Sequence, residues 1–260
     1  MTSTSATVFR APGRPSRQAV IVAAGLNNRP EAMHPIIETL NRRGYDCVRV
    51  AFRFGQHRPS DAIVHDWVSA LSEAYASSRQ QYASEHIHAA VYSLGALVTL
   101  TFLQRHEAEY LNRLFLIAPP LALTRPARLL RYVTPLRAVG AALPSLAPRD
   151  VRARSVTSLA DYHAMLTLID GLDRGPLPPN IGRAKTLVVM GANDEFVDTR
   201  GVCEWIRRHE LPWATRVIDR DPASTTPRHL LLSESAVGPA GWRVLTGELI
   251  AHLGQQAPPQ

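Results

Sequence analysis

The sequence is poor in cysteine, because its 260 residues include only Cys47 and Cys203. Two cysteines cannot build a disulfide framework or a cysteine-ligated zinc cluster, so neither device is expected to hold the fold together. Both lie among apolar or helical neighbours, which favours small buried side chains over reactive thiols. Nothing in this cysteine usage points to an oxidising compartment.

Long apolar runs are also missing. No stretch of the sequence approaches the roughly 20 apolar residues that a membrane-spanning helix needs. The first apolar run, residues 19–24, is too short for the apolar core of a secretory signal peptide. We therefore expect a cytoplasmic protein.

Lysine is almost absent, since Lys185 is the only one, and arginine supplies nearly all of the positive charge behind a formal net charge of +7. Clustered cations would suggest a nucleic-acid partner. The arginines are instead spread along the chain, without the interleaved aromatic residues that stack on bases. This favours a solvated basic surface and no nucleic-acid partner, with attraction to anionic lipid or an acidic substrate as the alternative.

Short apolar runs alternate with helical patterns along most of the chain. Strands are expected at residues 18–24, 46–52, 86–92, 113–118, 185–190 and 215–219. Helices are expected at about residues 30–43, 60–80, 94–104, 199–209 and 239–253, with Ser60 as an N-cap. This alternation predicts an α/β fold with a mostly parallel central sheet and helices on both of its faces.

Residues 121–181 interrupt the alternation. Prolines punctuate the first half of this segment, which indicates several short helices, and no strand is expected within it. An insertion of roughly 60 residues between two sheet strands is too long for a structureless loop. The sequence therefore predicts a helical lid or cap at 121–181, within a single domain that spans residues 1–260.

Three apolar side chains of the predicted lid, Leu129, Val133 and Leu136, are spaced to share one helical face. The spacing favours packing of the lid onto the core of the domain. A weak contact with a membrane surface is the alternative, because arginines accompany these residues.

Ser93 is the candidate nucleophile. It follows the predicted strand 86–92 and opens a largely apolar helix. A sharp strand-to-helix turn lifts a serine hydroxyl above the sheet and brings it near the helix N-terminus, as nucleophilic catalysis needs. Small residues around the serine relieve crowding; Gly95 provides one, whereas Val91 occupies the other small position. A serine that only caps the helix is the alternative.

Asp194 is the candidate acid. It follows the predicted strand 185–190 at the carboxyl edge of the sheet, where sites of open α/β sheets form. There it could orient an imidazole and stabilise its charged form. The alternative is that Asp194 caps a turn or the next helix. Glu195 and Asp198 are less favoured substitutes, because they lie further from the end of the strand.

His229 is the candidate base among ten histidines. Its loop follows the last predicted strand, at the same edge of the sheet as Ser93 and Asp194. His57, in the loop after the second predicted strand, is the main competitor.

These residues resemble the α/β-hydrolase family, because serine, acid and histidine follow one another in that order, each after a strand. Residues 23–60 resemble the early region of its monoacylglycerol-lipase and carboxylesterase branch. The resemblance implies an α/β-hydrolase fold and an oxyanion hole made by the backbone amides of Leu26 and Leu94. The departures from the family pattern include Ala24, in place of the histidine usually found before the loop glycine, and Val91, in place of a glycine.

The resemblance implies a serine hydrolase that cleaves carboxylic esters with an apolar acyl group or monoacyl lipids. The substrate would be a small ester or lipid-like molecule, and the reaction would pass through an acyl-enzyme without a metal or organic cofactor. Thioesterase or acyltransferase activity on the same site is an alternative. A non-catalytic hydrolase scaffold that acts as a binding protein is another, favoured by Val91 and Ala24.

Overall fold

A computed structural model describes residues 6–13, 16–55, 58–174 and 177–254. Its centre is a seven-stranded sheet with the strand order β1-β3-β2-β4-β5-β8-β9. The strand β1 runs antiparallel to β3, and the other neighbours pair in parallel, which confirms the predicted mostly parallel sheet. The bounds of these strands are β1 Ala6–Phe9, β2 Ala19–Ala23, β3 Asp46–Val50, β4 Ile87–Tyr92, β5 Arg113–Ile117, β8 Lys185–Gly191 and β9 Ala214–Ile218.

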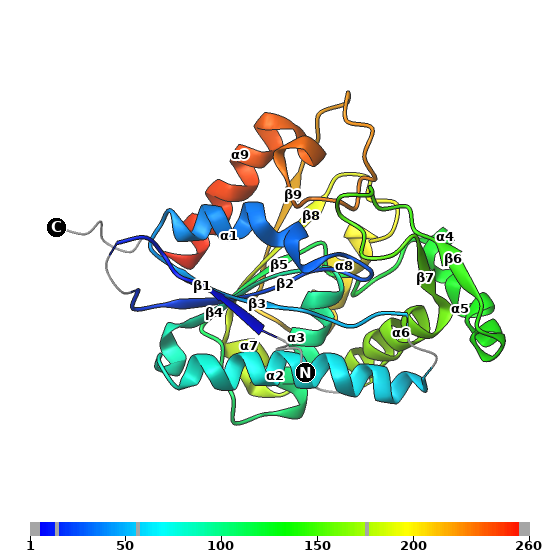
Figure 1. Ribbon diagram of the computed structural model, residues 1–260, viewed down its shortest axis with the longest axis horizontal. Helices are drawn as coiled ribbons and strands as arrows, with labels where there is room; N and C mark the ends of the chain where they lie inside the picture. The colour runs from blue at the N-terminus through cyan, green and yellow to red at the C-terminus, as the bar shows by residue number, and fades with distance from the viewer. Residues whose placement is uncertain (1–5, 14–15, 56–57, 175–176, 255–260) are drawn as a thin grey trace.

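Helices cover both faces of the sheet (Figure 1). The helices α1 (His34–Asn41) and α9 (Glu234–Leu253) pack on one face. The other face carries α2 (Ser60–Arg79), α3 (Leu94–Arg105), α6 (Leu159–Asp173) and α8 (Thr199–Arg208). Short helical turns complete the fold at η1 Pro30–Met33, η2 Ser84–His86 and α7 Pro179–Arg183.

Two apolar clusters lie on opposite sides of the sheet because alternate residues of a strand point to opposite faces. In β2, for example, Ile21 belongs to the cluster under α2, α3 and α6, whereas Val20 and Val22 belong to the cluster under α1 and α9. The central strands are thus buried on both sides, which explains their nearly continuous apolar sequences. Within the described part of the chain, no helix combines the length and apolar character needed to cross a bilayer.

The expected N-cap role of Ser60 is wrong. Pro59 occupies the cap position, and Ser60 is the first residue of α2. Because the hydroxyl of Ser60 is therefore inside the helix rather than ahead of it, it bonds elsewhere: its Oγ lies 2.6 Å from Nδ1 of His163 on α6. The contact joins two helices that cover the same face of the sheet.

The segment 121–181 contains helices, as expected, but also two strands that the sequence did not predict. Its elements are α4 Arg125–Arg128, α5 Leu130–Val133, η3 Thr134–Val139, β6 Ala142–Pro144, β7 Val156–Ser158 and the long helix α6. The strands β6 and β7 form a separate antiparallel pair. Each is only three residues long, too short to show an alternating pattern, and a proline ends the first.

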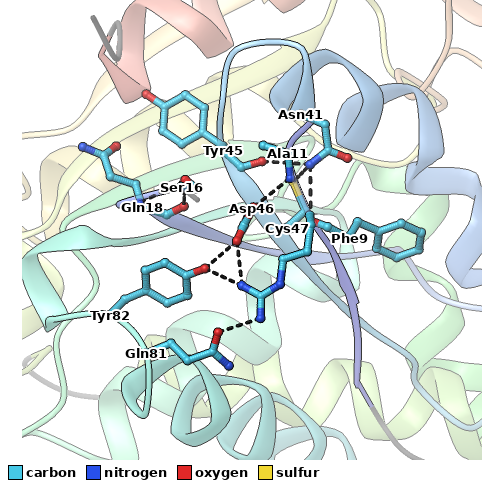
Figure 2. Close-up of polar contacts among 11 residues, drawn as sticks. Phe9, Ala11, Ser16, Gln18, Asn41, Tyr45, Asp46, Cys47, Gln81 and Tyr82 are labelled. Carbon is cyan, nitrogen blue, oxygen red and sulfur yellow. Dashed lines mark hydrogen bonds and ion pairs between the residues drawn. The ribbon is translucent and has the colours of Figure 1, made fainter. Parts of the chain in front are cut away.

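A buried carboxylate at the start of β3 binds three groups from neighbouring segments of the chain (Figure 2). Asp46, the first residue of β3, accepts hydrogen bonds from the guanidinium of Arg10 at 2.7 Å, the hydroxyl of Tyr82 at 2.6 Å and the amide of Ala11 at 2.7 Å. Burial by itself would raise the pKa of Asp46, but these hydrogen bonds outweigh it and lower the pKa. The folded state therefore holds this carboxylate as an anion.

We expect Asp46→Asn to lower the free energy of unfolding by about 1–3 kcal/mol, because the amide cannot accept all three hydrogen bonds of the carboxylate. Urea denaturation at neutral pH measures this loss. Asp66→Asn is the control, since Asp66 pairs with Arg58 at the surface and should cost less than about 0.5 kcal/mol.

The pH dependence of this difference tests the lowered pKa. A carboxylate whose pKa is lower in the folded state stabilises fully above its unfolded pKa of about 3.9. That contribution disappears as the pH falls through the folded pKa. The stability difference between the wild type and Asp46→Asn should thus be constant between about pH 5 and 7 and should shrink below about pH 4. A difference that stays unchanged in acid contradicts the assignment.

Candidate active site

Ser93 occupies the sharp turn between β4 and α3. Its backbone has φ 50° and ψ −113°, a conformation that residues other than glycine seldom adopt. The amide of Ser93 donates a hydrogen bond to the carbonyl of Ile117 in β5 at 2.8 Å, which anchors the turn to the sheet. A strained strand-to-helix turn of this kind is the setting that a nucleophilic serine requires.

Close contact between α3 and β2 explains the glycine at position 95. A Cβ atom on Gly95 would lie 2.7 Å from the carbonyl oxygen of Ala23, so no side chain fits there without moving the backbone. Val91 stands opposite Ala23 in the sheet register and is fully buried. It belongs to the same apolar cluster as the smaller Ala89 and Ala96.

The structure brings Ser93, His229 and Asp194 together in one chain of hydrogen bonds. Nε2 of His229 lies 2.9 Å from Oγ of Ser93, and Nδ1 lies 2.8 Å from Oδ2 of Asp194. The three residues come from the end of β4, the loop after β9 and the loop after β8. All three segments meet at the carboxyl edge of the parallel strands, as the sequence predicted.

Asp194 is buried, and its second carboxylate oxygen is occupied as well. Oδ1 accepts hydrogen bonds from the amides of Phe196 at 2.7 Å and Val197 at 2.9 Å. Burial raises the pKa of Asp194, but the hydrogen bond and charge of His229 and these two amides outweigh it, so the pKa is lowered overall. The carboxylate is therefore an anion at neutral pH, held in a fixed orientation toward the imidazole.

The two substitute acids take other roles. Glu195 accepts a hydrogen bond from the backbone amide of His229 at 3.2 Å, and Asp198 caps α8 by accepting one from the amide of Gly201 at 3.2 Å. Asp194 is the carboxylate that contacts the imidazole of His229. His57, the competing histidine, lies outside the described residues.

The two predicted oxyanion donors flank the serine. Leu94 is the first residue of α3, where a helix leaves its backbone amides without intrahelical acceptors. Leu26 lines the same cavity as Ser93. The preceding Gly25 passes so close to the serine that a Cβ atom on it would lie 3.1 Å from Cβ of Ser93.

A cavity of about 140 Å³ opens beside Ser93 and His229. Its walls come from the loop after β2, from the segment around β6, from α6 and from the loops after β8 and β9. The apolar part of the wall is formed by Leu26, Leu146, Ala147, Met165, Phe196, Pro227 and Leu230. The sequence did not reveal Met165 or Tyr162 as lining residues, because they reach the site only through the packing of α6.

Asn27 is a further residue that the sequence analysis missed. It is buried with φ 55°, and its side-chain amide donates to Oγ1 of Thr157 at 2.9 Å and to the carbonyl of Arg154 at 3.0 Å. Asparagine is among the few non-glycine residues that readily take this left-handed conformation. An asparagine directly after Gly25 and Leu26 therefore indicates a tight turn in the loop after β2. Asn27 ties the loop after β2 to the inserted segment.

Among the described residues, no group of three or more histidine, cysteine, aspartate or glutamate side chains could hold a metal ion. The two cysteines are free, and Cys47 is buried whereas Cys203 is partly exposed.

Comparison with known proteins identifies the fold. A family model described as serine aminopeptidase, S33, matches residues 14–218. A search of curated proteins finds no match.

Solved structures resemble this one over nearly its full length. A soluble variant of monoglyceride lipase from Saccharomyces cerevisiae superposes with a TM-score of 0.71 at 10% identity, covering 95% of this chain and 90% of that one. A structure described under LipS and LipT, two metagenome-derived lipolytic enzymes, superposes with a TM-score of 0.69 at 14% identity, covering 97% of this chain and 98% of that one. Monoacylglycerol lipase from Paleococcus ferrophilus gives 0.63 at 16%, covering 95% and 98%. These likenesses confirm the predicted α/β-hydrolase fold.

We expect Gly95→Ala to destabilise the protein by about 1–3 kcal/mol, because the added methyl group meets backbone and cannot rotate away. Gly247→Ala is the matched control. Gly247 lies inside α9 with open space around it, so the same substitution should stabilise by about 0.5–1 kcal/mol. The melting temperature should fall for Gly95→Ala and rise for Gly247→Ala. Equal shifts of the two melting temperatures would contradict the close contact at Gly95.

Proposed function

The chain belongs to the hydrolase family described as serine aminopeptidase, S33, and on that premise we propose that it cleaves carboxylic esters through Ser93, His229 and Asp194. The observation that carries the proposal is the continuous chain of hydrogen bonds from Asp194 through His229 to the strained Ser93. A serine hydroxyl needs an adjacent base to become a good nucleophile, and the base needs an orienting group.

In the first half of the proposed reaction, Nε2 of His229 takes the hydroxyl proton as Oγ of Ser93 attacks the ester carbonyl carbon. The carbonyl oxygen becomes an oxyanion that accepts hydrogen bonds from the amides of Leu26 and Leu94. When this intermediate collapses, the bond to the leaving alcohol breaks, and His229 returns the proton to that alcohol. An acyl group is left on Ser93.

In the second half, water replaces the alcohol. His229 takes a proton from the water as it attacks the acyl carbonyl, and then gives that proton to Oγ of Ser93 as the carboxylic acid leaves. Asp194 stabilises the imidazolium in both halves. The low pKa of Asp194 supports this role, because it keeps a negative charge next to the ring.

The lining of the cavity supports the proposal that the protein recognises an apolar acyl group of its substrate. Leucine, methionine, phenylalanine and proline side chains form a large share of its wall, and polar residues such as Asn28 and Thr157 complete the lining. Small esters and monoacyl lipids fit this description. Thioesters and acyl transfer to other acceptors would use the same groups and are distinguished by assay rather than by geometry.

A non-catalytic scaffold is the competing hypothesis from a different class. Backbone strain such as that at Ser93 costs of order 1–3 kcal/mol and is maintained mainly where it has a use. Strain together with an intact Ser93–His229–Asp194 arrangement supports an enzyme.

A fluorophosphonate probe tests the nucleophile. We expect the wild type to be labelled and Ser93→Ala to remain unlabelled, because only an activated serine attacks the probe. Chromogenic esters of increasing acyl length would then define the acyl preference. A folded wild-type protein that neither labels nor cleaves these esters contradicts the proposed function.

Asp194→Asn should lower kcat by about 10³- to 10⁴-fold, since the neutral amide neither stabilises the imidazolium nor selects the correct tautomer. Asp198→Asn is the matched control, because asparagine also caps helices and Asp198 does not contact His229. Steady-state ester hydrolysis measures both variants. Equal losses of kcat in the two variants would contradict a direct role of Asp194 in stabilising the imidazolium.

We further propose that the segment 121–181 serves as a lid that contacts an anionic lipid surface. Figure 1 shows α4, α5 and β6 together at one end of the molecule. Leu129 is 61% exposed and Leu136 is 55% exposed, so the favoured interpretation, that they pack the lid onto the core, is wrong for these two. Tyr132, Val139 and Leu146 are each 80% exposed, and Leu146 also lines the cavity.

The charge of this segment supports the same partner. Its first part, residues 121–149, contains five arginines and no aspartate or glutamate, and one of these, Arg131, pairs with Asp170 of α6. Basic residues next to exposed apolar side chains are the combination that binds anionic membrane surfaces. A cavity whose mouth carries Leu146 would then receive its substrate from the lipid surface.

Flotation with vesicles tests this contact. We expect the wild type to float with vesicles that contain phosphatidylglycerol and not with pure phosphatidylcholine, and we expect salt to weaken the binding. Tyr132→Ser and Val139→Ser should reduce flotation several-fold. Val244→Ser, an exposed apolar residue on α9, is the control that should not. Equal effects of all three substitutions would contradict the proposal.

A further inference from the structure

Tyr92 links two loops of the candidate site that are distant in the sequence. It is the last residue of β4 and directly precedes Ser93. Its side chain is 3% exposed and lines the cavity. The hydroxyl donates a hydrogen bond to the backbone carbonyl of His229 at 3.1 Å, across 137 residues of sequence.

The loop that carries His229 needs such a tie. Residues 219–233, between β9 and α9, form neither helix nor strand. Arg220 holds the first half of this loop through hydrogen bonds to Ser224 and Thr226. At the other end, the backbone of His229 is held on both sides, its amide by the carboxylate of Glu195 and its carbonyl by Tyr92.

The ring of Tyr92 makes two further contacts. Its centroid lies 5.3 Å from that of the His229 imidazole, and Phe196 approaches the imidazole at 5.4 Å. On the oxyanion side, a Cβ atom on Gly25 would lie 2.7 Å from Cε1 of Tyr92, so the ring rests directly against the loop that carries Leu26. One side chain thus packs against the proposed base and against the loop of a proposed oxyanion donor.

We propose that Tyr92 is a positioning residue that fixes His229 and the Leu26 loop relative to Ser93. The inference rests on the proposed function of the Ser93 site. Small errors of placement matter at such sites, because a displacement of about 1 Å in a reacting group can cost about 10²-fold in rate. Since Tyr92 is adjacent to Ser93 in the chain, it ties the base to the same turn that holds the nucleophile.

The hydroxyl of Tyr92 remains a donor across the working pH range. Burial, followed by the negative charges of Asp194 and Glu195, raises its pKa well above the ordinary value of tyrosine. The hydrogen bond to His229 is therefore not lost by deprotonation of Tyr92, so it does not depend on pH in that range.

Tyr92→Phe removes the hydroxyl and keeps the ring. We expect kcat for ester hydrolysis to fall by about 10- to 100-fold while KM stays within about threefold, because the base is displaced but the cavity wall is retained. The rate of fluorophosphonate labelling should fall in parallel. Melting temperatures of both proteins establish that the variant is folded.

Tyr75→Phe is the matched control. Tyr75 is also 3% exposed, and its hydroxyl donates to the carbonyl of Tyr110 at 3.1 Å, but it lies on α2 and does not line the cavity. This variant loses that hydrogen bond and the one that the hydroxyl accepts from the amide of Tyr110 at 3.3 Å, so its melting temperature should fall at least as far as that of Tyr92→Phe. Its kcat should match the wild type.

The outcomes separate this inference from the proposed function. If the wild type neither labels nor hydrolyses esters, the proposed function fails. If the wild type is active and Tyr92→Phe keeps kcat within about twofold, or if Tyr75→Phe loses as much, the positioning role of Tyr92 is overturned.

Discussion

The strained turn at Ser93 is the constraint on which the site depends. The chain turns there from the central strand β4 into α3 with a positive φ at a serine. Such a turn persists only when its surroundings hold it. Here a hydrogen bond to β5 anchors the serine amide, and Gly95 lets α3 lie directly on β2. Without that close approach, the hydroxyl would not meet the imidazole from the distant loop.

The parallel sheet explains how residues far apart in the sequence meet at one site. Each parallel strand ends at the same edge, so a residue placed just after a strand reaches that edge whatever its position in the sequence. For this reason the mostly parallel character of the sheet and the placement of Ser93, Asp194 and His229 at its carboxyl edge could be predicted from sequence alone. The structure places the imidazole of His229 between the other two side chains, 2.9 Å from Oγ of Ser93 and 2.8 Å from Oδ2 of Asp194.

Other features depend on contacts that no local pattern carries. The hydroxyl of Ser60 bonds to α6, the three-residue strands β6 and β7 pair only with each other, and Leu129 faces solvent although its spacing suits a buried face. The link between Tyr92 and His229 is of the same kind, because it joins the end of β4 to the loop after β9 through a backbone carbonyl. Sequence periodicity reports which face of an element is apolar, but not what covers it.

The central claim is that Oγ of Ser93 forms a covalent acyl intermediate. Rapidly quenched reactions with an activated ester, followed by mass spectrometry of the digested protein, test this directly. The account predicts that the acyl group appears on the peptide that contains Ser93, before the steady state, and is absent from Ser93→Ala. Ester cleavage at the full rate with no acyl group on that peptide would contradict it.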